Sequence, residues 1–213
     1  MTKIIDLRVP TSWDDVCIRQ FEALQSIDKD DENADFEIVS VLCDIDQDIV
    51  ESLPIKEFGS ILSKLSFLST SPQPHRPAKQ LLIDDKVINV TLSAQEMCAA
   101  QFLDYKNILS KENVDRRTAR LMAVFMIPDG KEYNKGYNTN EWIDFLNNNL
   151  SVVEVQSYTN FFMLTYKTFA TVFLKYSIRE MKKMKGLTQE ERMKILTPLQ
   201  QGLTIIQNGG FLE

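Results

Sequence analysis

Few side chains in this sequence are spaced for catalysis. His75, the sole histidine, lies in a proline-rich segment between Pro74 and Arg76. A catalytic histidine needs a rigid mount and a partner held at hydrogen-bond distance, so this position predicts an ordinary exposed histidine. Carboxylates are plentiful, and no spacing sets one pair apart for glycosidase-type acid–base chemistry. The sequence therefore predicts a protein that is not an enzyme.

An acidic run near position 44 resembles the start of a calcium-binding loop. Asp44, Asp46 and Asp48 have the required alternation. Such a loop also needs glycine at its sixth position and glutamate at its twelfth, where this chain has Ile49 and Ile55. Helix capping together with a solvated acidic face explains the run better.

The three cysteines do not indicate a metal or redox site. Cys17, Cys43 and Cys98 are scattered, and none belongs to a CxxC motif or a Cys/His cluster. This pattern is typical of reduced thiols in a cytosolic setting, and the first residues carry no long apolar run that would predict a signal peptide. Neither GxxxxGK[ST] nor GxGxxG occurs. We expect no metal and no cofactor.

Charge is distributed unevenly along the 213 residues, of which 44% are hydrophobic and 25% charged. Residues 1–60 hold 15 acidic and 5 basic side chains, a net charge of −10, whereas the remainder carries +4. The overall charge of −6 argues against a protein whose whole surface attracts nucleic acid. A charge-split chain can stack head to tail with copies of itself or bind oppositely charged partners; two solvated faces are the alternative.

Apolar spacing predicts a mainly α fold, a multi-helix bundle with one small β-hairpin at about 80–91 and, as an option, a short N-terminal strand at 3–9. The hairpin would turn at Asp84 and Asp85. Three regions follow: an acidic helical region at 1–68, a Pro-rich linker at 69–78, and the hairpin with further helices at 79–213; one integrated domain is the alternative. Helices are expected from Thr11 or Ser12 onward, at about 34–43, 46–52, 55–67, 94–109 and 114–126, from Asn140, at about 151–185, and from Thr188.

The helix expected at 151–185 is apolar nearly all round. Phe162, Phe169 and Phe173 lie on its main apolar face, which predicts either a central core helix or a subunit interface. Its basic end, with Lys182, Lys183 and Lys185, suits a helix C-terminus; a weak nucleic-acid contact is the alternative. The apolar stretch 158–178 has Lys167 at its centre, so we expect no membrane span.

Several phrases of the sequence, taken in order, resemble proteins encoded in the structural gene modules of tailed phages of Bacteroidales, including crAss-like phages. The similarity spans about residues 5–165 and includes no active-site motif. Its phrases are Val9–Val16 with Gln20 and Phe21, Lys64–Ser69 running into the Pro-rich stretch, the hairpin, Ala100–Asp104, Leu121–Phe125, Pro128–Tyr133, and Gly136 with Tyr137.

The resemblance implies a non-enzymatic virion protein, made in the host bacterial cytoplasm, that forms a ring or connector in the neck or tail. Its partners would be copies of itself, the portal and neighbouring rings, with weak contact to packaged DNA if the basic end lines a channel. A non-virion tail assembly chaperone is the alternative, and a nucleic-acid-binding regulator is a third reading. Candidate contact residues are Leu82, Ile83, Lys86 and Val87 in the hairpin, Tyr133 and Tyr137 in the loop 128–139, and the three phenylalanines and three lysines of the long helix.

Overall fold

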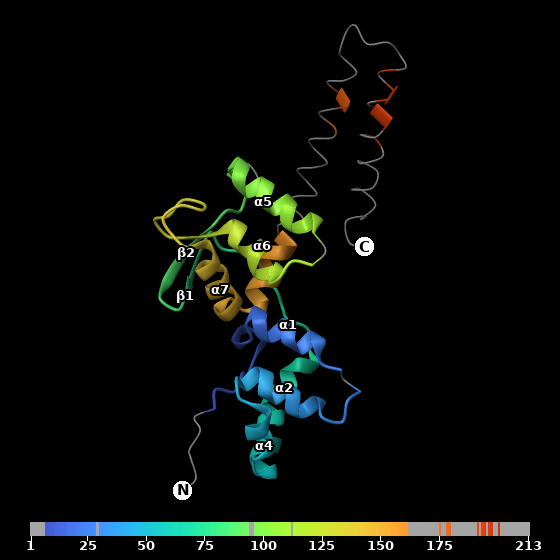
Figure 1. Cartoon of the computed structure of the whole chain (residues 1–213), viewed down its shortest axis with the longest axis vertical. Coiled ribbons are helices and arrows are strands. Elements are labelled where there is room, and N and C mark those ends of the chain that lie inside the picture. The colour runs from blue at the N-terminus through green and yellow to red at the C-terminus, as the bar shows by residue number, and fades with distance from the viewer. Residues whose placement is uncertain are drawn as a thin grey trace. The chain divides into compact units, whose positions relative to one another are not determined.

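The computed structural model describes residues 7–28, 30–93, 96–111 and 113–161, together with the separate positions 175, 178, 179, 191, 193, 194, 196, 197 and 200. The chain divides into two compact units: Met1–Leu92 with Met97–Tyr158, and Ser93–Glu96 with Thr159–Glu213. The fold is mainly helical with a small antiparallel sheet (Figure 1), which confirms the predicted fold class. The candidate interaction site lies in the first unit.

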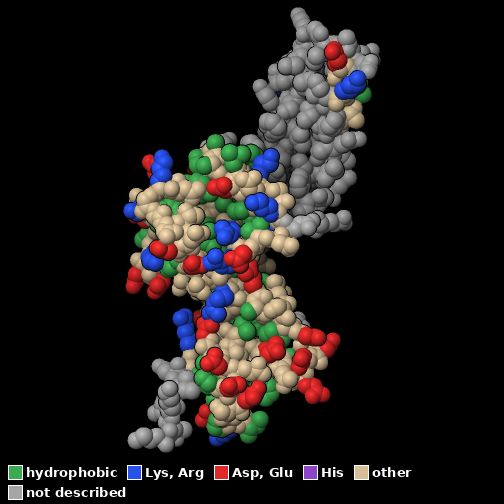
Figure 2. Space-filling view, viewed as in Figure 1, with side chains coloured by type: hydrophobic (Ala, Val, Ile, Leu, Met, Phe, Trp, Pro, Cys, Tyr) green, Lys and Arg blue, Asp and Glu red, His purple; other side chains and the backbone are tan. Residues whose placement is uncertain are grey.

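Short helices build the N-terminal part of the first unit. They are α1 (Ile18–Ser26), α2 (Ala34–Cys43), α3 (Gln47–Glu51) and α4 (Ile55–Lys64), with 3-10 turns at Trp13–Asp15 and Leu65–Ser69. Acidic side chains gather over this part of the molecule (Figure 2). Of the optional N-terminal strand at 3–9, residues 3–6 lie outside the described residues, and positions 7–9 are not in a strand.

The helix expected from Thr11 or Ser12 is broken at Val16 and Cys17. Both residues have extended backbone, and the Val16 carbonyl accepts a 2.9 Å hydrogen bond from the amide of Val152. The Ile18 amide donates in turn to the Leu150 carbonyl at 3.2 Å. A long-range bridge of backbone hydrogen bonds therefore replaces a helical turn, and α1 begins only at Ile18.

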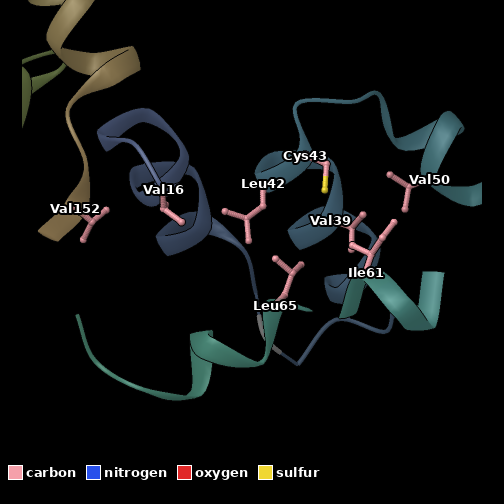
Figure 3. Close-up of a cluster of buried hydrophobic side chains, with 8 residues drawn as sticks. All are labelled: Val16, Val39, Leu42, Cys43, Val50, Ile61, Leu65 and Val152. Carbon is pink, nitrogen blue, oxygen red and sulfur yellow. The ribbon is translucent and has the colours of Figure 1, made fainter. Parts of the chain in front are cut away.

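A buried apolar cluster holds the N-terminal helices together (Figure 3). Val152, which lies beyond the sheet in the chain, packs into this cluster. The first unit therefore draws its N-terminal core from both ends of its sequence. The cluster consists of Val16, Val39, Leu42, Cys43, Val50, Ile61, Leu65 and Val152.

The acidic run at 44–48 connects two helices. Asp44 ends α2 in the left-handed conformation at φ 52°, and Asp46 occupies the N-cap position of α3. The guanidinium of Arg19 lies 2.6 Å from the Asp44 carboxylate on the surface. Asp44 and Asp46 thus occupy cap positions at an acidic surface, and the Asp46 side chain makes no capping hydrogen bond.

The sheet comprises β1 (Gln80–Ile83), β2 (Lys86–Val90) and β3 (Met126–Pro128), in the order β1-β2-β3. The predicted hairpin is confirmed, but the third strand, β3, was not predicted. The prediction that a helix ends at Met126 is wrong. Met126 is fully buried and pairs with Val90, and Pro128 lies opposite Ile88. Proline is tolerated there because β3 is an edge strand among the described residues.

Three helices pack beside the sheet: α5 (Ala99–Ser110), α6 (Arg117–Phe125) and α7 (Thr139–Asn149). Asn138, and not the predicted Asn140, caps α7, because its side-chain oxygen accepts from the amide of Asn140 at 3.0 Å. Arg116 precedes α6 at φ 51° and forms an ion pair with Asp144 of α7. Helical residues 152–161 follow α7; the predicted continuation to 185 lies outside the described residues except at 175, 178 and 179.

The Pro-rich segment lies against the helical residues 152–158. The amide of His75 donates to Ser157 Oγ at 2.9 Å. The amide of Ala78 donates to the Tyr158 hydroxyl at 3.1 Å, and that hydroxyl donates back to the Ala78 carbonyl at 2.8 Å. Ser157 and Tyr158 are buried, so fixed partners hold this segment in place despite its lack of helix or strand.

Candidate protein-interaction site

The turn of the β1–β2 hairpin is formed by two left-handed residues. Asp84 and Asp85 have φ angles of 48° and 58°, and Ile83 pairs with Lys86 across them. Two positive φ angles are typical of the type I′ turn, whose twist matches that of the flanking strands. Aspartate tolerates this region better than most side chains, which explains how a turn without glycine closes the hairpin.

The inner face of the hairpin fixes it to the rest of the unit. Ile88 is fully buried, and Leu81 lies opposite it half-buried. The Lys86 ammonium lies 3.9 Å from the ring centroid of Phe145 in α7, within the range of a cation–π contact. Of the predicted contact residues, Lys86 therefore contacts the protein's own helix, and Ile83 is half-buried.

The outer face of the hairpin exposes an apolar pair. Leu82 and Val87 lie directly opposite each other, and 70% and 40% of their surfaces are accessible to solvent. Beside them, Gln80 Nε2 donates to Asn89 Oδ1 at 2.8 Å, and Asn89 Nδ2 donates to Asp129 Oδ1 at 2.7 Å. This hydrogen-bonded row orders the polar side chains and leaves the apolar pair uncovered among the described residues.

β1 forms an open edge of the sheet within the described part of the chain. The Val90 amide donates to the Lys79 carbonyl at 2.8 Å, and hydrogen-bonded pairs alternate along an antiparallel ladder. The backbone N–H and C=O groups of Gln80 and Leu82 therefore point away from β2. No charged or proline residue lies within Gln80–Ile83, although such residues commonly protect an edge strand from pairing.

The two predicted contact tyrosines of the loop 128–139 are tied to the protein itself. The Tyr133 hydroxyl donates to Asp104 Oδ2 of α5 at 2.7 Å, and burial raises the pKa of Tyr133 far above its usual value. The Tyr137 hydroxyl accepts from the Asn134 amide at 3.2 Å, and its ring stacks edge-on against Trp142. Both side chains are half-buried, so they are less available to a partner than Leu82 and Val87.

An open cavity of about 500 Å³ lies between α5 and the loop 128–139. Charges of both signs line it, including Asp104, Lys111 and Arg120. Its two hydroxyl-bearing residues, Tyr133 and Thr139, are hydrogen bonded to Asp104 and Asn134. Burial raises the pKa of Tyr133, so its hydroxyl stays protonated and donates to the Asp104 carboxylate. The Thr139 hydroxyl donates to the Asn134 amide oxygen, which is not a general base.

His75 has a fixed partner that the sequence did not indicate. Its Nε2 lies 3.2 Å from Glu154 Oε2, and its side chain is about half exposed at 45%. Burial raises the pKa of Glu154, and the adjacent His75 partly opposes that rise. The Ser157 hydroxyl donates to the Val153 carbonyl, so it is not activated by His75. A lone histidine in a Pro-rich stretch gave no signal for this pairing.

The remaining predicted contact residues belong to the long helix expected at 151–185. Phe162, Phe169, Phe173, Lys182, Lys183 and Lys185 lie outside the described residues, as does most of the apolar stretch 158–178. Within the described part of the chain, no helix is long and apolar enough to cross a bilayer. No three metal-ligating side chains there are grouped to hold an ion.

Comparisons with known proteins identified no relative. A scan against protein-family models, a search of curated proteins and a search of solved structures each found no match to this chain.

Proposed function

We propose that this chain is a non-enzymatic structural protein of a tailed-phage virion, acting in a neck or tail ring through protein–protein contacts. The observation that supports a docking role is the outer face of the β1–β2 hairpin, where Leu82 and Val87 are exposed beside an open strand edge. The phage setting rests on the resemblance of the sequence phrases alone. Ring symmetry would bring many copies of the same edge into one assembly.

The hairpin suits a docking element because it combines two sources of binding free energy. Burying one leucine side chain that water now contacts is worth about 1.5–3 kcal/mol. An added strand also satisfies the backbone groups of Gln80 and Leu82. The inner face meanwhile keeps the hairpin in place through Ile88 and the Lys86–Phe145 contact, so little ordering would be needed on binding.

The charge of the N-terminal helices supports the same kind of role. Acidic side chains gather over them (Figure 2), and an acidic surface favours partners with a basic face while repelling nucleic acid. Contact between these helices and a basic neighbouring ring would follow from this charge. A nucleic-acid-binding regulator is less well supported by it.

Quantitative mass spectrometry of purified virions tests the proposal. A ring component should appear at a fixed copy number set by the symmetry of the ring. A tail assembly chaperone should be abundant in infected cells and missing from virions, and that result would replace the ring proposal with the chaperone alternative.

A pair of matched variants tests the docking surface in the same phage. Leu82→Asp places a charge on the exposed apolar pair and should reduce incorporation into virions. Ile55→Asp is the control, because Ile55 is 85% exposed on α4, far along the chain from the hairpin. Equal incorporation of both variants would remove the hairpin from the proposal.

A further inference from the structure

We propose that β1 pairs in antiparallel fashion with β1 of a second copy of this chain, across a two-fold axis at Leu81. This inference rests on the proposed docking role of the hairpin and names its partner. In a ring assembly such a two-fold contact joins two rings face to face and not neighbours within one ring. It starts from the open edge, where Gln80 and Leu82 direct their backbone donors and acceptors away from β2. An added strand must therefore form its backbone hydrogen bonds with Gln80 and Leu82.

The positions of the outward groups determine the register. Antiparallel pairing about Leu81 brings Gln80 of one copy opposite Leu82 of the other, and the reverse. Each such pair can exchange both N–H···O bonds, because all four residues direct these groups to the new interface. The two copies of Leu81 then face each other as a non-hydrogen-bonded pair. Strand β1 is thus complementary to itself in this register, as a two-fold contact requires.

The charges at the ends of β1 favour antiparallel over parallel pairing. Lys79 immediately precedes the strand, and Asp84 and Asp85 immediately follow it; all three are exposed. Antiparallel pairing places the basic start of each strand beside the acidic turn of the other copy. Parallel pairing would set the two acidic turns side by side, where like charges repel. The edge itself therefore distinguishes between the two arrangements.

Pairing also covers part of the exposed apolar pair on the outer face. In this register Leu82 of each copy lies beside Gln80 of the other on the outer face, with Val87 in the next strand. The new neighbour reduces the 70% exposure of Leu82. One continuous sheet results, with the order β3-β2-β1-β1-β2-β3, and its open β1 edges are removed.

Position-specific disulfide cross-linking tests the register in the full-length chain. Cys98 is exposed, whereas Cys17 and Cys43 are buried, so the background variant is Cys98→Ser. Leu81→Cys should form a disulfide-linked dimer on mild oxidation, because Cα atoms of a non-hydrogen-bonded antiparallel pair are about 4.5 Å apart. Ile83→Cys is the matched control on the same face, also half-buried. Its two copies would lie about 13 Å apart along the strands, and they should not cross-link.

A proline substitution tests the strand edge without a cross-linker. Leu82→Pro removes an N–H that points away from β2, so it leaves the β1–β2 ladder intact while blocking the new pair. We expect it to weaken the dimer measured by sedimentation equilibrium at least about tenfold, since two intermolecular bonds are lost. Leu82→Val keeps the N–H and should preserve the dimer. Circular dichroism confirms that each variant is folded.

The outcomes separate this inference from the proposed function. A monomeric wild-type chain, or equal cross-linking at positions 81 and 83, overturns the two-fold pairing. A Leu82→Pro chain that is folded and still dimerises as the wild type does also overturns it. If Leu82→Asp is lost from virions while Leu81→Cys never self-cross-links, the docking surface stands and its partner is a different protein. If Leu81→Cys cross-links and virions lack the chain, the pairing stands and the virion role falls.

Discussion

Replacing Tyr158 by phenylalanine tests whether the Pro-rich segment is held as rigidly as its contacts indicate. The Tyr158 hydroxyl donates to the Ala78 carbonyl at 2.8 Å and accepts from the Ala78 amide at 3.1 Å. Phenylalanine keeps the ring, which is fully buried, and removes these two hydrogen bonds. A net hydrogen bond contributes about 1 kcal/mol. Because Ala78 is exposed and water can satisfy its backbone, we expect a loss of about 1–2 kcal/mol in the free energy of unfolding.

Urea denaturation at neutral pH measures this loss. The midpoint should fall with the m-value unchanged, since the variant removes contacts without altering the surface exposed on unfolding. Tyr137→Phe is the matched control, because its hydroxyl accepts one 3.2 Å bond from an exposed loop amide, and we expect a change below about 0.5 kcal/mol. If Tyr158→Phe is no more destabilising than this control, the segment is not fixed by Tyr158 and the reasoning is refuted.

Three further changes probe other parts of the first unit. Val152→Ala should lower the free energy of unfolding by about 1.5–3 kcal/mol, measured by chemical denaturation, because it opens a cavity in the N-terminal cluster. Asp85→Gly should raise the melting temperature, because glycine occupies φ 58° without strain; no rise would show that the aspartate is unstrained. Burial raises the pKa of Glu154 above its usual 4.5, so the folded state favours the protonated carboxyl, and this stabilisation is lost as pH rises through the raised pKa. As pH rises above about 4.5, the usual pKa of a glutamate, Glu154→Gln should therefore lose less stability than the wild type; parallel curves would contradict that assignment.

The sequence predicted those elements whose signals are local. The bounds of α2 agree with the predicted 34–43, and the turn at Asp84 and Asp85 closes the hairpin as expected. These predictions depend only on periodicity and turn chemistry, which a single sequence displays.

The missed features depend on contacts between distant residues. Val16 leaves the helix that its neighbours favour because its carbonyl bonds to Val152. Met126 is a strand residue because Val90 pairs with it. His75 is held in place because its backbone amide donates to Ser157 and its side chain pairs with Glu154. No local sequence pattern indicates such distant partners. Tertiary contacts override helix propensity when they satisfy the hydrogen bonds of buried backbone groups.

The bridge between Val16 and Val152 has a consequence for how the chain folds during synthesis. The N-terminal helices leave the ribosome first, yet their apolar cluster lacks Val152 until nearly all of the first unit has been translated. The emerging helices therefore expose apolar surface from an incomplete core, to which chaperones can bind and through which the chain can aggregate. Closing a contact over such a span also slows folding. Ribosome-bound nascent chains that end before position 150 should accordingly stay protease-sensitive, and protection should appear only after residue 152 has cleared the exit tunnel.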